Sequence, residues 1–540
     1  MPLFLQFVLA LLIVAVSIRP LMRLAPRLGL TDAPGPRKVH STPIPRVGGI
    51  AMAIGIFVPL LFTQSLGGPL TGFIVGAATL LVFGIWDDRA TLGYRAKFVG
   101  QVAAVLLCMW LGDVRIDSWT FDHRVPLPPV FGEVLTFLFL VGVTNAVNLS
   151  DGLDGLAGGM ALLCLCAIAL LAAISGNVPV IAVALIECGA ILGFLRFNTH
   201  PAQIFMGDSG SQLLGFSIGV LSILATQGDG TSVSAALPLL LLGLPILDTL
   251  SVMIQRVRAG RSPFSPDRNH LHHKLLGLGF AHAEAVVLVY LLQVVLFLVA
   301  YWLRFESDLM ILGVFVALAI GTLVSLRWAD ATPWRAHSGR ALPVFSALIA
   351  RLREPVSPNA STGARIMAVC MIAYAGMAIA RAGTVGLDVG VLCLALLVAL
   401  LVNAARGAGA AWLDRTLTYT AVVLVVWLDQ TSPHVDGQWH TVGWLLVGIT
   451  GVVALARFVL ARPGNFSVTS LDLLVVFVAI VVPLLPAPAQ LPPAVTAGIA
   501  KSVVLLYAVE LSSLGGAGRS ASRLAIAVLF AAVAVRGLLA

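Results

Sequence analysis

The feature that most constrains this chain is the recurrence of apolar segments long enough to cross a bilayer. A hydrocarbon core about 30 Å thick needs about 20 apolar residues in a helix, and such segments recur throughout the 540 residues. Hydrophobic residues make up 59% of the chain and charged residues only 11%, whereas soluble proteins carry roughly a quarter charged residues. The sequence therefore predicts an all-α polytopic membrane protein. It excludes a soluble globular enzyme, a disordered chain and a nucleic-acid-binding domain.

The predicted spans form two groups, about eleven and about seven in number, separated by a polar segment. The first group lies near residues 3–24, 47–65, 69–86, 98–112, 129–147, 156–174, 178–195, 209–226, 233–255, 285–303 and 309–326. The second group lies near 366–381, 386–405, 416–430, 441–457, 470–487, 495–512 and 524–539. The segment between them is rich in proline and arginine, which is typical of a boundary. We predict a membrane domain at 1–327, a polar cytoplasmic linker at 328–365 and a C-terminal membrane domain of unknown role at 366–540.

Orientation follows from the positive residues. If the loop after the first span is inside, the inner loops up to residue 305 carry fourteen Lys and Arg residues, and the outer loops carry only Arg115, Arg124 and Arg304. Positive residues gather in cytoplasmic loops. The bias predicts an N-terminus outside, and it accounts for the net charge of +8 without a nucleic acid partner.

Two adjacent acids, Asp87 and Asp88, end the third predicted span in the motif GIWDDR. Neighbouring carboxylates repel each other at a membrane edge unless a cation compensates them. One interpretation is a solvated cap of the span. The other is a site that ligates or polarises around a divalent metal, because Mg²⁺ prefers hard oxygen ligands.

A second polar group lies in the segment NAVNLSDGLDGLAGG, residues 145–159. It places Asn145, Asn148, Asp151 and Asp154 at steps of three, which is one face of a helix. The interleaved glycines let the backbone approach a ligand closely. The end of a span needs one capping residue rather than four polar groups in register, so the spacing predicts a binding site.

A third polar element is Asp208, which lies between Gly207 and Ser209 at the start of a predicted span. An Asp-Ser pair at this position is a good helix cap. The free N–H groups of a helix N-terminus also bind phosphate, so capping and function are compatible.

Three histidines, His270, His272 and His273, lie beside Arg268 and Lys274 in a predicted inner loop. A zinc site or a basic, phosphate-facing loop would explain them. No Cys or acid stands at metal-ligand spacing to these histidines, which favours phosphate. The first inner loop adds further basic residues on a segment rich in Pro and Gly: Arg37, Lys38, His40 and Arg46.

All five polar elements lie on the predicted cytoplasmic side. Carboxylates, amides, histidines and cations that converge with glycines are the groups that a Mg²⁺–diphosphate site needs. Each element alone is ambiguous, but their common side predicts such a site at the membrane surface.

The motifs together resemble one family. The set RKxHxxPIPRxGG, GxxDDR, NAxNLxDGLDGLAGG, FNxxPAxxFMGDSGS and NHLHHxLL is similar to the polyprenyl-phosphate N-acetylhexosamine-1-phosphate transferases, the WecA and MraY superfamily, and is nearer the WecA branch. The resemblance covers about residues 1–330. It implies a bundle of ten or eleven membrane helices with a cytoplasmic cleft. Residues 366–540 have no counterpart in it.

The resemblance implies a phosphoglycosyl transferase reaction. Undecaprenyl phosphate would attack the β-phosphorus of a UDP-N-acetylhexosamine, most simply UDP-N-acetylglucosamine. The products would be UMP and a lipid-linked sugar that initiates a cell-envelope polysaccharide. Both reactants are anions, so cations must neutralise charge in the transition state. The implied partners are these two substrates and the lipid bilayer, with a homodimer allowed, and the implied location is the bacterial inner membrane with the active site facing the cytoplasm.

The resemblance also implies roles for individual residues. Asp208 and Asn148 would ligate Mg²⁺, with Mn²⁺ as an alternative, and Asp87 and Asp88 would position the lipid phosphate. One of those two acids could serve as a base, although a phosphate monoester needs little deprotonation at neutral pH. The nucleotide and sugar would be held by Asn145, Asp151, Asp154, Arg268, His270, His272 and His273, and the phosphate clamps would be Lys38 and Arg46.

Two alternatives remain open from sequence. The first keeps the chemistry but uses another UDP-N-acetyl sugar, such as the 6-deoxy derivatives of fucosamine or quinovosamine. The second is a membrane transporter, for which eighteen spans would be suitable. Transporters place polar groups near the bilayer midplane, whereas here they lie at the ends of spans.

Overall fold

The chain is predominantly helical in the residues that the computed structural model describes, which are 3–33, 42–227, 231, 233–262, 269–332, 360–405, 411–431, 437–459, 493–513 and 519–539. Ten of the described helices are long and apolar enough to cross a membrane. The strands in these ranges form two short antiparallel ribbons. The prediction of an all-α polytopic membrane protein is confirmed.

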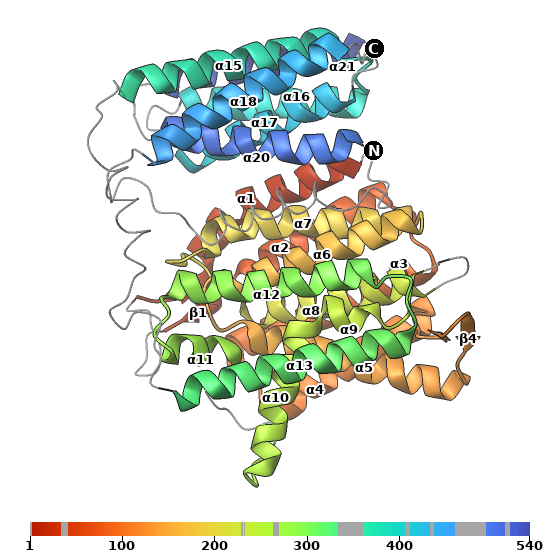
Figure 1. The fold of residues 1–540 in the computed structure, drawn as a ribbon. Coiled ribbons are helices and arrows are strands. Elements are labelled where there is room, and N and C mark those ends of the chain that lie inside the picture. The colour runs from red at the N-terminus through yellow and green to blue at the C-terminus, as the bar shows by residue number, and fades with distance from the viewer. Residues whose placement is uncertain are drawn as a thin grey trace. The chain divides into compact units, whose positions relative to one another are not determined.

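The chain divides into two compact units, one made mainly of residues 2–338 and the other mainly of residues 339–540. The helices of the first unit (Figure 1) are α1 (Leu3–Leu28), α2 (Gly48–Thr63), α3 (Gly68–Ala90), α4 (Tyr94–Gly112), α5 (Pro129–Ser150), α6 (Leu156–Ile174), α7 (Val178–Asn198), α8 (Gly207–Thr226), α9 (Leu237–Leu241), α10 (Gly243–Arg258), α11 (Leu271–Gly277), α12 (His282–Trp302) and α13 (Asp308–Ala331). Strand β1 (Thr31–Asp32) pairs with β2 (Ile44–Pro45), and β3 (Ser118–Thr120) pairs with β4 (Arg124–Pro126).

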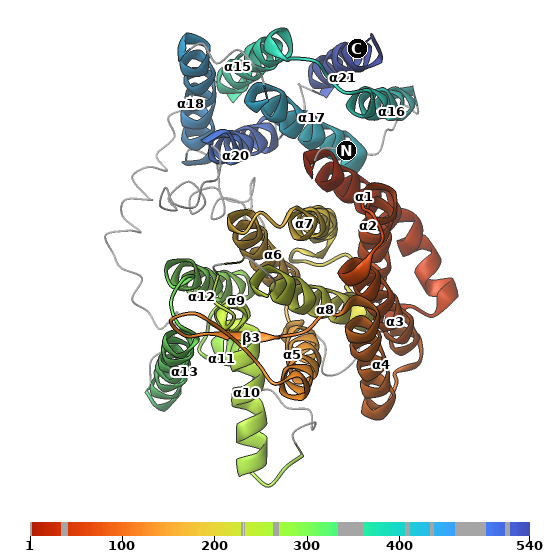
Figure 2. The same cartoon turned by 90° about the vertical axis from the view of Figure 1, so that its right-hand side faces the viewer.

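Helix α8 is the central helix of the first unit. It packs against α2, α3, α5 and α6 (Figure 2), and 94% of its 18-residue apolar stretch is buried. Glycines allow this close packing at its first turn. A Cβ on Gly49 of α2 would lie 2.3 Å from the backbone nitrogen of Gly210, and one on Gly84 of α3 would lie 2.4 Å from the Cα of Ser209. The polar first turn of α8 is therefore fixed closely against two neighbouring helices.

One predicted span is broken. The segment predicted at 233–255 forms two helices, α9 and α10, which meet at Leu242. Pro245 explains the break, because proline lacks an N–H and its ring clashes with the carbonyl four residues earlier, which belongs to Leu241 at the end of α9. Beyond the break, α10 projects from the other helices of its unit (Figures 1 and 2) and ends in Arg256 and Arg258.

The second unit is also helical. Its described helices are α15 (Ala360–Arg381), α16 (Leu387–Ala405), α17 (Ala411–Gln430), α18 (Gly437–Val459), α20 (Pro493–Ser513) and α21 (Arg519–Leu539). Inside this unit Lys501 is fully buried, and its Nζ lies 2.7 Å from Oδ2 of Asp429. The span predicted at 470–487 and most of the predicted linker lie outside the described residues, so the division at 327 and 366 stays a prediction.

Candidate active site

The last turn of α3 is joined to the first turn of α8 by Asp88. Its Oδ1 accepts a hydrogen bond from the Asp208 backbone N–H (2.9 Å), and its Oδ2 accepts from the N–H and the hydroxyl of Ser209 (3.1 and 2.7 Å). Gly207 adopts a positive φ of 70°, and a Cβ there would lie 2.4 Å from Asp88 Oδ2. Asp88 therefore caps α8 with both carboxylate oxygens and fixes the position of Asp208. The Gly207-Asp208-Ser209 sequence permits this contact.

Lys97, in the first turn of α4, bridges two of the predicted acids. Its Nζ lies 2.5 Å from Asp208 Oδ2 and 2.6 Å from Asp87 Oδ2. The other oxygen of Asp87 accepts a hydrogen bond from the Leu92 backbone N–H (2.5 Å). In the sequence, Lys97 is one of the fourteen inner-loop cations and carries no predicted role in the site. The predicted span begins at residue 98, whereas α4 begins at Tyr94, so the sequence carries no signal that Lys97 belongs to the site.

Asn148, at the end of α5, contacts the carboxylate oxygen of Asp208 that Lys97 does not contact. Its Nδ2 donates to Asp208 Oδ1 (2.7 Å) and to the hydroxyl of Ser211 (2.7 Å). Both hydrogen bonds use the amide nitrogen, and Oδ1 of Asn148 has no hydrogen bond from any described residue. The amide oxygen thus stays free to bind a ligand beside the Asp208 carboxylate.

Asn145 does not join this group. Its Nδ2 donates to Gln101 Oε1 (2.7 Å) and to the Val141 carbonyl (2.8 Å). Gln101 in turn donates to Gln212 of α8 at 3.4 Å. Asn145 is thus engaged with side chains of α4 and with its own helix, and its predicted contact with the nucleotide stays a prediction.

The group around Asp208 has the donors that a hard divalent cation needs. Asp87 and Asp88 are only 4% and 5% exposed, whereas the Asp208 side chain is 26% exposed. Asp208 is thus the most accessible of the three carboxylates, and the free Asn148 oxygen lies next to it. Carboxylate and amide oxygens suit Mg²⁺, which usually keeps several waters and takes one or two carboxylates. The residues fit such an ion, and their role as ligands stays a prediction.

Asp151 directly follows α5 and lies near several charged side chains. Burial is the largest cause that raises the pKa of Asp151, to about 7, and the charges of Asp208, Asp88 and Asp154 raise it further while Arg46 lowers it. Like charges disfavour ionisation of a carboxyl group. Three further carboxylates thus lie near Asp151, and a bound cation would offset their repulsion.

Asp154 lies in the loop between α5 and α6 and contacts the loop between α7 and α8. Its Oδ2 accepts a hydrogen bond from the Ala202 backbone N–H (3.1 Å) and lies 2.7 Å from His200 Nδ1. His200 is not among the predicted site residues, because it lies 46 positions from Asp154 in the sequence and no pattern predicts the contact.

The predicted basic loop holds its histidines in different surroundings. His270 precedes α11, and its Nδ1 lies 2.9 Å from Oδ2 of Asp248 on α10. The other oxygen of Asp248 accepts from the Leu271 backbone N–H (2.7 Å). Asp248 thus fixes the start of α11, a role that the sequence analysis missed.

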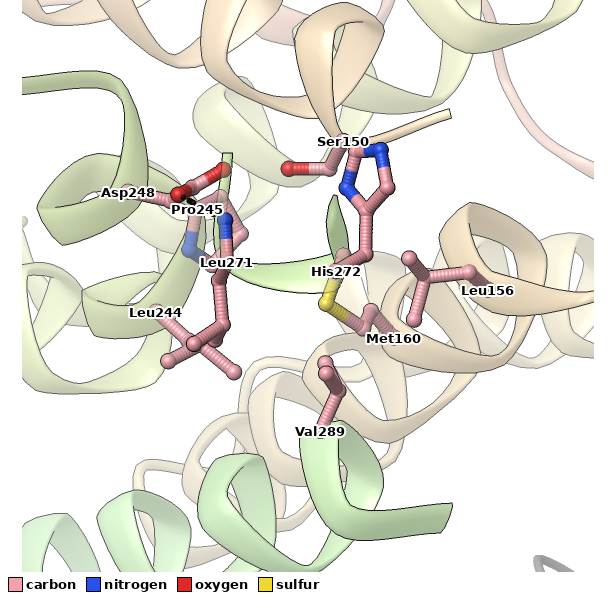
Figure 3. Close-up of a pocket in the computed structure, with 9 residues that line it drawn as sticks. All are labelled: Ser150, Leu156, Met160, Leu244, Pro245, Asp248, Leu271, His272 and Val289. Carbon is pink, nitrogen blue, oxygen red and sulfur yellow. Dashed lines mark hydrogen bonds between the residues drawn. The ribbon is translucent and has the colours of Figure 1, made fainter. Parts of the chain in front are cut away.

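His272 lines a small cavity (Figure 3) together with Asp248, Met160 and other mainly apolar side chains. The cavity measures about 10 Å³, which is room for at most one water molecule, so it is not a substrate site. Burial lowers the pKa of His272 to about 4, and its ring is therefore neutral at pH 7. A Cβ on Gly152 would lie 2.2 Å from its Nε2, so this ring packs directly beneath the loop that carries Asp151 and Asp154.

The predicted phosphate clamps are only partly described. Arg46 forms an ion pair with Asp32 across the β1–β2 ribbon. Lys38 and Arg268 lie outside the described residues. The roles predicted for Arg46, His270, His272 and His273 stay predictions.

Comparison with known proteins identifies relatives of the first half. The sequence model of glycosyl transferase family 4 matches residues 70–226, a range that contains Asp87, Asp88, Asn148, Asp154 and Asp208. The chain is 37% identical over 293 residues to a probable undecaprenyl-phosphate N-acetylglucosaminyl 1-phosphate transferase of Bacillus subtilis, covering 53% of this chain and 80% of that protein.

Two further relatives agree. A decaprenyl-phosphate N-acetylglucosaminephosphotransferase of Mycolicibacterium smegmatis is 36% identical, over 55% of this chain and 82% of its own length. The undecaprenyl-phosphate alpha-N-acetylglucosaminyl 1-phosphate transferase of Escherichia coli K12 is 31% identical, over 49% of this chain and 74% of its own length. Each match spans about half of this chain.

Proposed function

Because the chain belongs to glycosyl transferase family 4, we propose that it transfers N-acetylglucosamine 1-phosphate from UDP-N-acetylglucosamine to undecaprenyl phosphate and releases UMP. The observation that carries this proposal is the 37% identity to a protein of that stated activity over 80% of its length. The product would initiate a cell-envelope polysaccharide. The family likeness does not choose among UDP-N-acetyl sugars, so the 6-deoxy sugars remain the second candidates.

The acceptor side of the reaction is assigned to the group around Asp208. Asp208 and Asn148 would hold Mg²⁺, which when bound supplies positive charge beside the reacting phosphates. Asp88 acts as a positioning residue, because both its oxygens are used to cap α8. Lys97 places an ammonium between Asp87 and Asp208, where it can turn to an incoming phosphate. Neutralising the charge of two anionic reactants is the main requirement of phosphoryl transfer.

The donor side is assigned to the loop that carries Asp151 and Asp154. Both acids precede the glycine-rich start of α6, where the backbone can approach the uracil or ribose. His272 supports this loop from below as a neutral ring in contact with Gly152. Its assigned role is thus to shape the donor site, whereas His270 orients α11 through Asp248.

The location is proposed as the bacterial inner membrane, with the N-terminus outside and the active site at the cytoplasmic face. The support is the excess of Lys and Arg in alternate loops. A cysteine placed at the exposed Ser262 should react with a membrane-impermeant reagent only in inverted vesicles. Reaction in intact cells would contradict this orientation.

The experiment that tests the proposed function is a measurement of UMP release by the purified protein. We expect release from UDP-N-acetylglucosamine only when undecaprenyl phosphate and Mg²⁺ are both present. A panel of UDP-N-acetyl sugars in the same assay identifies the preferred donor. Absence of UMP with every sugar, from protein that is folded by thermal shift, would refute the proposal.

A further inference from the structure

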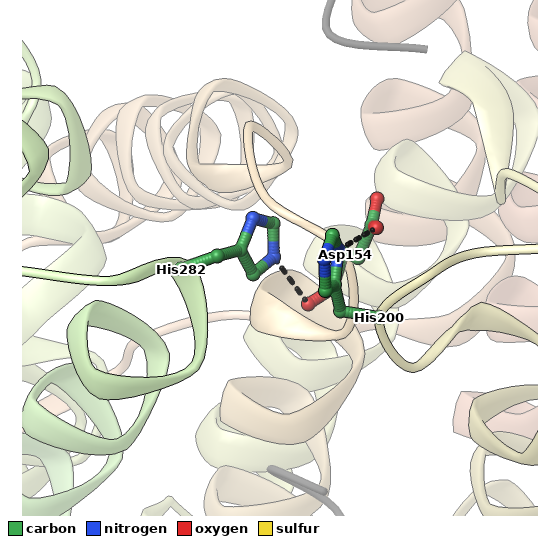
Figure 4. A group of neighbouring side chains, drawn as sticks. All are labelled: Asp154, His200 and His282. Atoms are coloured by element: carbon green, nitrogen blue, oxygen red, sulfur yellow. Dashed lines mark hydrogen bonds and ion pairs between the residues drawn. The ribbon is translucent and has the colours of Figure 1, made fainter. Parts of the chain in front are cut away.

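Three side chains from separate segments meet beside the candidate donor site (Figure 4). Asp154 precedes α6, His200 follows α7 and His282 begins α12. His200 Nδ1 lies 2.7 Å from Asp154 Oδ2, and His282 Nε2 lies 3.5 Å from the Asp154 carbonyl oxygen. One potential ligand atom from each residue lies within 4.8 Å of the others. The cluster therefore joins two imidazoles and a carboxylate around a common point.

The segments that carry these residues are held together independently of the cluster. Asn198, at the end of α7, accepts from the Gly155 backbone N–H (3.0 Å) and donates to the Ile204 carbonyl (2.9 Å). Tyr290 of α12 donates its hydroxyl hydrogen to the Gly155 carbonyl (2.6 Å). Asn198 and Tyr290 are both buried. The backbone next to Asp154 is thus fixed to both histidine-bearing segments, so the three side chains are preorganised.

A simple hydrogen bond between Asp154 and His200 would hold the two loops without a third residue. The cluster also contains His282, which that hydrogen bond does not require. The His282 ring stacks on His200 with 4.2 Å between ring centroids and 23° between planes. His282 thereby brings a further imidazole nitrogen within 4.8 Å of the same carboxylate, which the bond between Asp154 and His200 does not require.

We propose that Asp154, His200 and His282 form a binding site for a divalent transition metal ion, with Zn²⁺ as the best match. Two imidazoles and one carboxylate are a common zinc ligand set, and three protein ligands leave a position for water or another ligand. The site is open to solvent, because the side chains of Asp154 and His200 are 18% and 47% exposed. The Ala202 backbone N–H orients the carboxylate, as groups outside the ligand set do in metal sites.

This site differs in chemistry from the group around Asp208. That group offers carboxylate and amide oxygens, which suit Mg²⁺, whereas imidazole suits Zn²⁺, Cu²⁺, Ni²⁺ and Fe²⁺. The two sites would therefore take different ions from the same mixture.

The site also has a consequence for turnover, which rests on the proposed function. Asp154 is assigned to the uracil or ribose of the donor, so a metal ion on its carboxylate would remove that contact. Zn²⁺ should then inhibit competitively with UDP-N-acetylglucosamine at saturating Mg²⁺. Transfer would then respond to transition metals through a site that shares Asp154 with the donor-binding loop, whereas His200 and His282 have no assigned role in the reaction.

The test is direct binding of Co²⁺ to the purified full-length protein, followed by its visible absorption spectrum and displaced by Zn²⁺. We expect one ion per chain with the intense bands of a four- or five-coordinate site. His200→Ala and His282→Ala should each weaken binding at least tenfold. His123→Ala, which removes an exposed histidine near the β3–β4 ribbon, is the matched control and should bind as the wild type does.

The outcomes separate the metal site from the proposed function. Absence of Co²⁺ binding by folded wild-type protein, or binding as tight as that of the wild type by both histidine variants, would overturn the site. If Co²⁺ binds as expected and no UMP is released under any condition, the site stands and the proposed function fails. If transfer is active, His282→Ala should keep turnover and lose at least tenfold in Zn²⁺ sensitivity; unchanged sensitivity would overturn the inhibitory role.

Discussion

Replacing Lys97 by Met tests the arrangement of charges at the Asp208 site. The ammonium lies 2.5 Å from Asp208 and 2.6 Å from Asp87, where it occupies carboxylate oxygens that a divalent cation would also use. Two opposite effects are therefore expected. Removal of the cation should slow transfer between two anions, and it should tighten binding of Mg²⁺.

The size of each effect follows from the geometry. Two unit charges 4 Å apart interact by about 4 kcal/mol at an effective dielectric constant of about 20. The Lys97 side chain is 31% exposed, so screening by water reduces its competition with Mg²⁺ to about 1–2 kcal/mol. That energy corresponds to about 5- to 30-fold tighter Mg²⁺ binding. Loss of one group that stabilises developing negative charge should lower kcat by about 100-fold or more.

The assay is a Mg²⁺ titration of initial UMP release, with wild type, Lys97→Met and Lys97→Arg compared. Arg95→Met is the matched control, because Arg95 is an exposed cation in the same helical turn. We expect Arg95→Met to behave as wild type and Lys97→Arg to retain part of the rate. A Lys97→Met variant with a reduced rate and an unchanged Mg²⁺ requirement would refute the competition between Lys97 and the metal.

Further predictions concern the two sides of the site and the second unit. Asp208→Asn should lower kcat by at least about 100-fold through loss of a metal ligand, with thermal stability retained; a rate within tenfold of wild type would contradict its assignment. Gly152→Ala should lower the free energy of unfolding by about 1–3 kcal/mol through overpacking, since the new Cβ would lie 2.2 Å from Nε2 of His272. Thermal melting and the KM for the donor check this prediction. Gly142→Ala is the control and should be neutral, because a Cβ there meets nothing within 4 Å. Burial raises the pKa of Asp151 from 3.8 to about 7, so folding takes up a proton at this group, and the group destabilises the metal-free protein increasingly from pH 4 to pH 7. The Tm difference between Asp151→Asn and wild type should therefore grow over that pH range. A constant Tm difference would argue against the raised pKa. A chain ending at Ser338 should still insert and turn over, and a folded but inactive product would show that the two units form one catalytic entity.

Much of the fold could be predicted from the sequence because apolar length is a local property. Segments such as 156–174 are long enough to cross a bilayer and lack interruptions, and they form single helices with the expected bounds. The segment at 233–255 is an exception, because it forms two helices and not one. Its hydrophobicity is continuous, but Pro245 cannot continue the helix from Leu241, and composition alone does not locate the break.

The site could be predicted less completely, because its contacts join distant segments. Asp88, Asn148 and Asp208 carry recognisable motifs, and the structure brings them together at the first turn of α8. Lys97 and His282 lie outside those motifs. Only tertiary packing places Lys97 beside the Asp208 carboxylate and His282 beside the backbone carbonyl of Asp154.

The protonation states of the histidines could not be predicted from the sequence either. The charge of a histidine depends on its burial, and the sequence pattern does not report burial. His272 was predicted as part of a basic loop, whereas it packs in a mainly apolar cavity with a lowered pKa.

Transfer of a sugar phosphate differs from transfer of a sugar alone in the fate of the β-phosphorus of the donor. Purified protein is incubated with undecaprenyl phosphate, Mg²⁺ and UDP-N-acetylglucosamine that is radiolabelled at the β-phosphorus. Attack at that phosphorus transfers it with the sugar, so we predict that the label moves into the lipid fraction while unlabelled UMP is released. Label that stays in the nucleotide as UDP would contradict transfer of a sugar phosphate.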